Sequence, residues 1–247
     1  MSHDEEADTA PLLRVDKVVK RFGGFCALDG TSFHLMPGEV LGLVGPNGSG
    51  KTTCINVISG IYPPNAGQVF LEGKPIGGLP SHKLVRLGIN RTFQVPQVFL
   101  ALTVRENVEI AATYGGRDGN ESDVDAILAS LELDTYCFRA AADLNSAQQK
   151  MLDLARALAT APRLLLVDEL AAGLHPAELQ RVAHKLRDLA SSGIALLVVE
   201  HLMGFIGGVT DRVIVLNAGH EIFEGTLSEA VRDPQVISVF LGGSDVH

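Results

Sequence analysis

The sequence has little of several features that define other classes of protein. Its 247 residues include only three cysteines, and Cys26, Cys54 and Cys137 are too widely spaced for a disulfide framework or a zinc site, so we expect reduced thiols in or near the core. Lys and Arg number 20 against 29 Asp and Glu, a net charge of −9. Because nucleic-acid binding needs clustered basic residues to neutralise phosphates, this balance argues against a nucleic-acid partner.

Long apolar runs are also lacking. A membrane-spanning helix needs about 20 apolar residues, and the best stretch, residues 193–209, is interrupted by Glu200 and His201. Residues 1–10 are acidic and polar, so we expect no signal peptide. If the protein works at a membrane, it must therefore bind other chains that span it.

Apolar residues make up 46% of the chain and charged residues 20%, which suits one large α/β domain with a subdomain. We expect a disordered acidic tail at residues 1–11, a folded domain at 12–243 and a short tail at 244–247. Apolar positions at three- and four-residue spacing predict a helical subdomain at about 95–160, inserted into the α/β core. Alternating or continuous apolar runs predict strands at 12–22, 31–35, 39–44, 67–73, 89–93, 164–168 and 193–199. We expect helices at 51–59 and 176–192, a hairpin around Ala218–Gly219, and a capping box at 226–229 that opens a last helix.

A glycine-rich segment follows the strand predicted at residues 39–44 and precedes a predicted helix. It reads GPNGSGKT, a full match to the phosphate-loop pattern G-x-x-x-x-G-K-[ST]. The glycines let backbone N–H groups converge on phosphate oxygens, and the helix presents its positive N-terminal end. The candidate phosphate-binding residues are Gly45, Pro46, Asn47, Gly48, Ser49, Gly50, Lys51 and Thr52, with Thr53 next to them. In this pattern Lys51 reaches the β- and γ-phosphates, and the Thr52 hydroxyl coordinates Mg²⁺.

A second signal is the sequence LLLVDE at residues 164–169. Four apolar residues form a core strand, and Asp168 emerges at its carboxyl end, where α/β folds bind ligands. Asp168 can hold a magnesium ion through its water shell, and Glu169 can polarise a water for attack on the γ-phosphate. Two carboxylates after an apolar strand are also a common surface feature, and the phosphate loop is what favours the catalytic interpretation.

Two further polar residues end predicted strands on the same edge. His201 follows the strand at 193–199 and could donate a hydrogen bond to the γ-phosphate, while Gln94 follows the strand at 89–93 and can bind a metal, a water or a neighbour. An ordinary structural role is as well supported as a functional one for both residues.

The order of these motifs resembles that of the ATP-binding cassette (ABC) family over about residues 12–243. GPNGSGKT, RTFQ at 91–94, LLLVDE and VVEH at 198–201 stand in the family's order. The resemblance implies a P-loop NTPase fold of the ABC type, with an antiparallel β subdomain and an inserted helical subdomain, that binds ATP and Mg²⁺. It implies that Gln94 senses magnesium and contacts membrane subunits, that Glu169 is the catalytic base, and that His201 is the switch histidine. It also matches Phe22 to the aromatic residue that stacks on adenine, although an ordinary strand phenylalanine remains the alternative.

Within the family, the sequence resembles the ATP-binding subunits of branched-chain amino-acid importers. The similar stretches include KRFGGFCALDGTSF, GINRTFQ, LTVRENV, ELAAGLHPAE and DPQVISVFLGG. The resemblance implies an ATPase on the cytoplasmic face of the cell membrane that powers import. Its expected partners are a second cassette, permease subunits that span the membrane and, indirectly, a solute-binding protein.

The sequence departs from the family pattern where the signature LSGGQ is expected. The corresponding residues are Leu144, Asn145, Ser146, Ala147 and Gln148. The resemblance implies that this signature acts on the nucleotide of a facing cassette. Asn145 can still donate a hydrogen bond, but the Ala147 methyl group replaces a glycine where the backbone approaches the γ-phosphate. His175 stands where Asp or Asn is usual, and Leu170 stands where proline is usual.

Three alternatives to a transport motor share the same nucleotide-binding parts. A DNA-repair or chromosome ATPase usually carries long coiled coils or zinc inserts, and this sequence has neither. A P-loop kinase or GTPase lacks support because the guanine motif NKxD is absent. A non-transport assembly or regulatory cassette stays open because of the altered signature. The sequence specifies neither the transported solute nor whether the dimer is homomeric.

Overall fold

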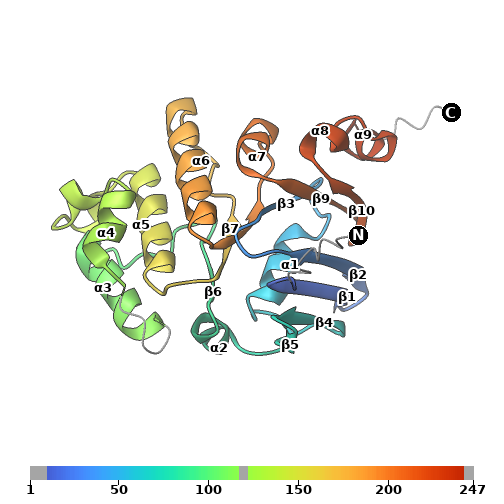
Figure 1. Cartoon of the computed structure of the whole chain (residues 1–247), viewed down its shortest axis with the longest axis horizontal. Helices are drawn as coiled ribbons and strands as arrows, with labels where there is room; N and C mark the ends of the chain where they lie inside the picture. The colour runs from blue at the N-terminus through green and yellow to red at the C-terminus, as the bar shows by residue number, and fades with distance from the viewer. Residues whose placement is uncertain (1–9, 117–121, 242–247) are drawn as a thin grey trace, which may run out of the picture.

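The computed structural model describes residues 10–116 and 122–241. All but the last two residues of the acidic tail expected at 1–11, and the whole of the tail expected at 244–247, lie outside this range. Two sheets and a group of helices make up the described part of the chain (Figure 1).

The larger sheet has six strands in the order β10-β9-β3-β8-β7-β6. These strands are β3 Val40–Val44, β6 Ile89–Arg91, β7 Leu164–Asp168, β8 Ala195–Val199, β9 Arg212–Asn217 and β10 His220–Gly225. All neighbours pair in parallel except β9 and β10, which form the antiparallel hairpin predicted around Ala218 and Gly219. Every residue of β3, β7 and β8 is buried, as the continuous apolar runs predict for strands covered on both faces.

The smaller sheet is antiparallel, with the order β2-β1-β4-β5. Its strands are β1 Leu13–Phe22, β2 Phe25–Leu35, β4 Ala66–Leu71 and β5 Lys74–Pro75. Helix α1, Lys51–Ile58, shares one apolar cluster with strands of both sheets, through Cys54, Ile55, Val57 and Ile58. The helix that follows the glycine-rich loop therefore packs between the two sheets (Figure 1).

Three helices lie to one side of the six-stranded sheet, between β6 and β7 in the chain (Figure 1). They are α3 Val104–Gly115, α4 Val124–Ser130 and α5 Ser146–Leu158, with short 3-10 turns at Asp134–Tyr136 and Ala141–Asp143. Helix α3 starts at a capping box in which Thr103 accepts from the backbone N–H of Glu106.

The remaining helices are α2 Ser81–Arg86, α6 Pro176–Ser191, α7 Met203–Val209, α8 Leu227–Ala230 and α9 Pro234–Leu241. The capping box predicted at residues 226–229 is present, since the Thr226 side chain accepts from the backbone N–H of Glu229. The helix that it opens is not the last one, because α9 follows it.

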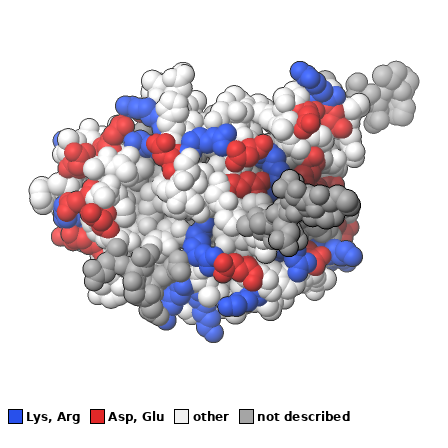
Figure 2. All heavy atoms as spheres, viewed as in Figure 1, with Lys and Arg blue, Asp and Glu red and all other residues white. Residues whose placement is uncertain are grey.

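Acidic and basic side chains are interspersed over the face shown in Figure 2. Within residues 10–116 and 122–241, no helix is long and apolar enough to cross a membrane.

Candidate functional site

The glycine-rich loop connects the buried strand β3 to helix α1. Gly45, Gly48 and Gly50 have positive φ angles of 147°, 80° and 110°, a backbone conformation that side chains disfavour. A Cβ atom on Gly45 would lie 2.2 Å from the Leu216 carbonyl oxygen, and one on Gly50 would lie 2.5 Å from that of Ala27. The loop is thus a cradle that only glycine can line at these two positions.

Lys51, the first residue of α1, folds back over this loop. Its Nζ donates to the carbonyl oxygens of Gly45 and Pro46, at 2.8 and 2.9 Å. Burial lowers the pKa of Lys51, while the nearby carboxylates of Glu169 and Asp168 oppose that shift. The amine is therefore held where the loop, the helix N-terminus and two carboxylates meet.

The hydroxyl-bearing residues around Lys51 differ in exposure. Thr52 is exposed and Thr53 is half-buried, so both side chains remain accessible to a ligand. The Ser49 hydroxyl is buried and has no hydrogen-bond partner among the described residues. An orphaned hydroxyl and a glycine cradle at a helix N-terminus are features that fit a phosphate group.

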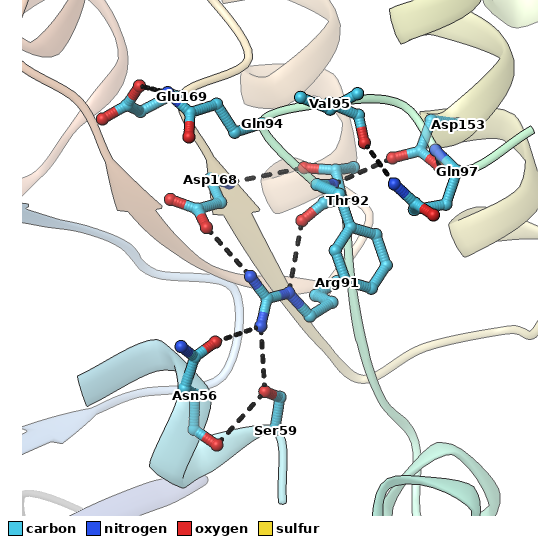
Figure 3. Close-up of polar contacts among 11 residues, drawn as sticks. Asn56, Ser59, Arg91, Thr92, Gln94, Val95, Gln97, Asp153, Asp168 and Glu169 are labelled. Atoms are coloured by element: carbon cyan, nitrogen blue, oxygen red, sulfur yellow. Dashed lines mark hydrogen bonds and ion pairs between the residues drawn. The ribbon is translucent and has the colours of Figure 1, made fainter. Parts of the chain in front are cut away.

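Asp168 and Glu169 lie at the carboxyl end of β7, as the sequence predicts. Glu169 has a φ of 47°, which turns its side chain out of the strand direction at a strained position. Gln94 Nε2 donates to Glu169 Oε2 at 2.5 Å, and His201 Nδ1 lies 4.0 Å from Glu169 Oε1 (Figure 3 shows the glutamine contact). The ends of β6, β7 and β8 therefore bring Gln94 and His201 together around the Glu169 carboxylate.

Asp168 forms a buried ion pair with Arg91, a contact that was not predicted from the sequence. Its Oδ2 lies 2.9 Å from Nη2 of Arg91, and the two side chains are only 7% and 9% exposed. Arg91 Nη1 also donates to Asn56 Oδ1 at 2.7 Å and to Ser59 Oγ at 3.2 Å, both contributed by α1 and its C-cap (Figure 3). Burial raises the pKa of Asp168, and Arg91 and Lys51 oppose that shift. The charged Arg91 inside the strand predicted at 89–93 is the signal from which a buried partner could have been inferred.

Phe22 ends β1 and is 42% exposed. Its ring meets Tyr62 edge to face, with centroids 5.1 Å apart, and Lys20 Nζ lies 5.1 Å from the Phe22 centroid. These contacts hold the ring while leaving part of it accessible for stacking.

The signature segment opens α5, and its polar side chains cap that helix. Asn145 Oδ1 accepts from the Gln148 backbone N–H at 2.8 Å, and Gln148 Oε1 accepts from the Asn145 backbone N–H at 3.0 Å. Asn145 and Ser146 are exposed, while Ala147 and Gln148 are half-buried. The segment therefore faces outward.

The two other departures from the family pattern have local structural roles. His175 is exposed and is the N-cap residue of α6, where its backbone N–H donates to Glu178 Oε2 at 2.8 Å. Leu170 is 2% exposed and belongs to the core, which gives an apolar residue at that position a packing role.

Comparisons with known proteins identify the family of the chain. The model of the family described as ABC transporter matches residues 28–172. The chain is 34% identical to the high-affinity branched-chain amino acid transport ATP-binding protein BraF of Pseudomonas aeruginosa, over 94% of this chain and 98% of that one. It is 36% identical to a probable branched-chain amino acid transport ATP-binding protein of Archaeoglobus fulgidus, over 95% of this chain and 96% of that one.

Solved structures of ATP-binding cassettes share the fold. One ABC transporter cassette in its ADP conformation is 33% identical, with a TM-score of 0.86 over 95% of this chain and 100% of that one. A dimeric cassette in a post-hydrolysis state, bound to ADP and phosphate, is 26% identical, with a TM-score of 0.77 over 87% of this chain and 98% of that one. The chain belongs to the ABC transporter family, as one of the ATP-binding cassettes that couple ATP hydrolysis to transport.

Proposed function

We propose that Mg²⁺ and ATP bind at the glycine-rich loop and that Glu169 is the catalytic base. The loop amides and Lys51 hold the phosphates, Phe22 stacks on the adenine, and the Thr52 hydroxyl and Asp168 hold the magnesium ion. The ion would neutralise charge that develops on the phosphates. Within the described residues, no group of three His, Cys, Asp or Glu side chains could hold a metal ion alone, and magnesium sites in such enzymes share their ligands with the phosphates.

The observation that carries the catalytic role is the position of the Glu169 carboxylate between Gln94 and His201. In that position Glu169 can take a proton from the attacking water, Gln94 can orient that water, and His201 can donate to the γ-phosphate. Gln94 follows β6 and His201 follows β8, the two strands beside β7. A small movement of the segment after either strand therefore changes the contacts of the Glu169 carboxylate.

The Glu169→Gln variant tests this assignment. The amide keeps the shape of the side chain but cannot accept the proton, so turnover should fall about 10²–10⁴-fold while ATP affinity is retained. Phosphate release and equilibrium nucleotide titration give the two values. Glu109→Gln, on the exposed face of α3, is the control and should match the wild type. Unchanged turnover in Glu169→Gln would exclude Glu169 as the base.

We further propose that the chain powers import of branched-chain or other hydrophobic amino acids from the cytoplasmic face of the cell membrane. The relatives of 34% and 36% identity, which carry branched-chain amino acid transport in their names, support this proposal. Its partners would be a second cassette and permease subunits, with a solute-binding protein acting through the permeases.

The transport proposal is tested by reconstituting the chain in lipid vesicles with permease subunits of a branched-chain amino acid importer from the same organism. Uptake of labelled leucine should require ATP on the cassette side and should be lost in Glu169→Gln. ATP hydrolysis without uptake of any hydrophobic amino acid would refute the import proposal but leave the ATPase assignment intact.

A further inference from the structure

Helix α5 carries three side chains at three-residue spacing, Lys150, Asp153 and Arg156, which place them along one side of the helix. Lys150 is 6% exposed and Asp153 is 5% exposed. Burying a charged group costs free energy unless the group is paired or hydrogen-bonded. The partners of these side chains therefore indicate what the side chains do.

Asp153 holds both ends of the segment that carries Gln94. Its Oδ2 accepts from the Phe93 backbone N–H at 2.9 Å, and its Oδ1 accepts from the Gln97 backbone N–H at 3.1 Å (Figure 3). Hydrogen bonds to a carboxylate are stronger than neutral ones, and here each oxygen fixes one end of the segment. Arg156 adds a contact farther along, with its Cζ 4.7 Å from the centroid of the Phe99 ring.

Lys150 holds the segment that begins at Glu169. Its Nζ donates to the carbonyl oxygens of Leu170 at 3.0 Å and Glu169 at 3.4 Å, and also to that of Ala172. An ammonium group has three protons to donate, so three carbonyl oxygens match its capacity. The backbone that positions the Glu169 carboxylate is thus fixed to the same helix as the Gln94 segment.

The N-terminal end of α5 is the outward-facing signature segment, residues 145–148. A helix of 13 residues is a stiff rod about 20 Å long, so a displacement at its buried middle is carried to its end. We propose that Lys150 and Asp153 are positioning residues that couple the chain's own nucleotide site to its signature segment, so that a ligand which moves the Gln94 and Glu169 segments also shifts residues 145–148. This inference rests on the proposed function, in which a facing cassette presents its nucleotide to that segment.

The coupling has a thermodynamic consequence. Because linkage between two binding sites is reciprocal, contact of a facing cassette with residues 145–148 also changes how Gln94 and Glu169 are held. Lys150 and Asp153 then influence turnover and the response to nucleotide without touching the nucleotide.

The first arm of the test uses the chain without nucleotide. Asp153→Asn keeps the side-chain volume but leaves one acceptor oxygen for two N–H groups, so amide hydrogen exchange at residues 93–97 should accelerate roughly tenfold or more. Asp233→Asn is the matched control, because Asp233 Oδ1 accepts from the backbone N–H groups of Gln235 and Val236, at 2.8 and 3.0 Å, far along the chain. Unchanged exchange at residues 93–97 in Asp153→Asn would overturn the proposal.

The second arm adds a non-hydrolysable ATP analogue and follows amide exchange at residues 145–148. In the wild type the analogue should change exchange there, and Lys150→Met combined with Asp153→Asn should abolish at least half of that response. The single variant Lys150→Arg retains a charged donor and should keep most of the wild-type response at residues 145–148. Lys83→Met, at an exposed position of α2, is the control and should leave the response at residues 145–148 unchanged.

Analogue affinity is measured in the same samples. It should stay within about threefold of wild type in all variants, because the glycine-rich loop is untouched. A wild-type change in amide exchange at residues 145–148 in the double variant would overturn the coupling. If the double variant does not fold, the same exchange measurement is made on Asp153→Asn alone. A wild-type chain that does not bind the analogue would refute the proposed function, whereas the first arm, read without nucleotide, decides separately whether Asp153 holds the Gln94 segment.

Discussion

The Arg91–Asp168 ion pair gives the sharpest prediction about stability. Arg91→Met removes the guanidinium group but keeps an unbranched side chain of related shape. It leaves the Asp168 carboxylate, only 7% exposed, without the partner that lies 2.9 Å away. It also removes the hydrogen bonds from Arg91 to Asn56 and Ser59, and with them a link between β6, β7 and α1.

The size of the effect follows from burial. Breaking one side of a buried ion pair typically costs about 3–5 kcal/mol, because a charge is left uncompensated in the interior. Arg14 and Asp16 form a pair at nearly the same distance, 2.8 Å, but with side chains 46% and 42% exposed. An exposed pair of this kind contributes about 0–1 kcal/mol, so Arg14→Met is a matched control that differs chiefly in burial.

Urea denaturation at pH 8 and pH 5 measures the free energy of unfolding for both variants. Without Arg91, the pKa of Asp168 should rise further above its value in the unfolded chain. The charged carboxylate destabilises the folded state when the pH is above that raised pKa, and the penalty shrinks as falling pH protonates it. The loss in Arg91→Met should therefore be larger at pH 8 than at pH 5. A loss below about 1 kcal/mol, equal at both pH values and equal to that of Arg14→Met, would show that the pair contributes nothing specific.

Three other predictions concern the nucleotide site, the signature and the β9–β10 hairpin. Lys51→Ala removes a charged donor worth about 1.5–3 kcal/mol, so nucleotide titration should show ATP affinity at least tenfold weaker, and equal affinities would place the phosphates elsewhere. Ala147→Gly should raise phosphate release by the purified chain alone, since losing one preorganised donor costs about 10²–10³-fold and removing the methyl group should recover part of it; a brisk wild-type rate with no gain would show that the signature is tolerated as it stands. Burial, together with the neighbouring Glu224, raises the pKa of Glu221 to about 7, against the opposing charge of Arg212. Between pH 4.5 and 7, Glu221 is therefore protonated in the folded state but ionised in the unfolded chain. Its contribution to the free energy of unfolding falls as the pH rises through that window. Glu221→Gln should remove that dependence in thermal melts at pH 5 and pH 8, and identical pH dependence in the two proteins would contradict the assignment.

The sequence determined the elements whose signals are local. Continuous apolar runs marked the buried strands β7 and β8, and the phosphate-loop pattern marked the turn between β3 and α1. Polar residues at the ends of predicted strands marked Gln94, Asp168 and His201, because parallel strands end at one edge of a sheet. These inferences succeed because strand periodicity, glycine backbone freedom and helix capping depend on residues close together in the chain.

Tertiary structure alone decided which distant groups share a buried charge or hydrogen bond. Arg91 pairs with Asp168 across 77 positions of sequence, and Asp153 reaches back 60 positions to the backbone of Phe93. Asn145 and Gln148 resembled parts of a signature that acts on another chain's nucleotide, and the fold shows that they also cap α5. No local pattern specifies these partners, because a buried charge is satisfied by whichever donor or acceptor the packing of the sheet and helices brings within about 3 Å.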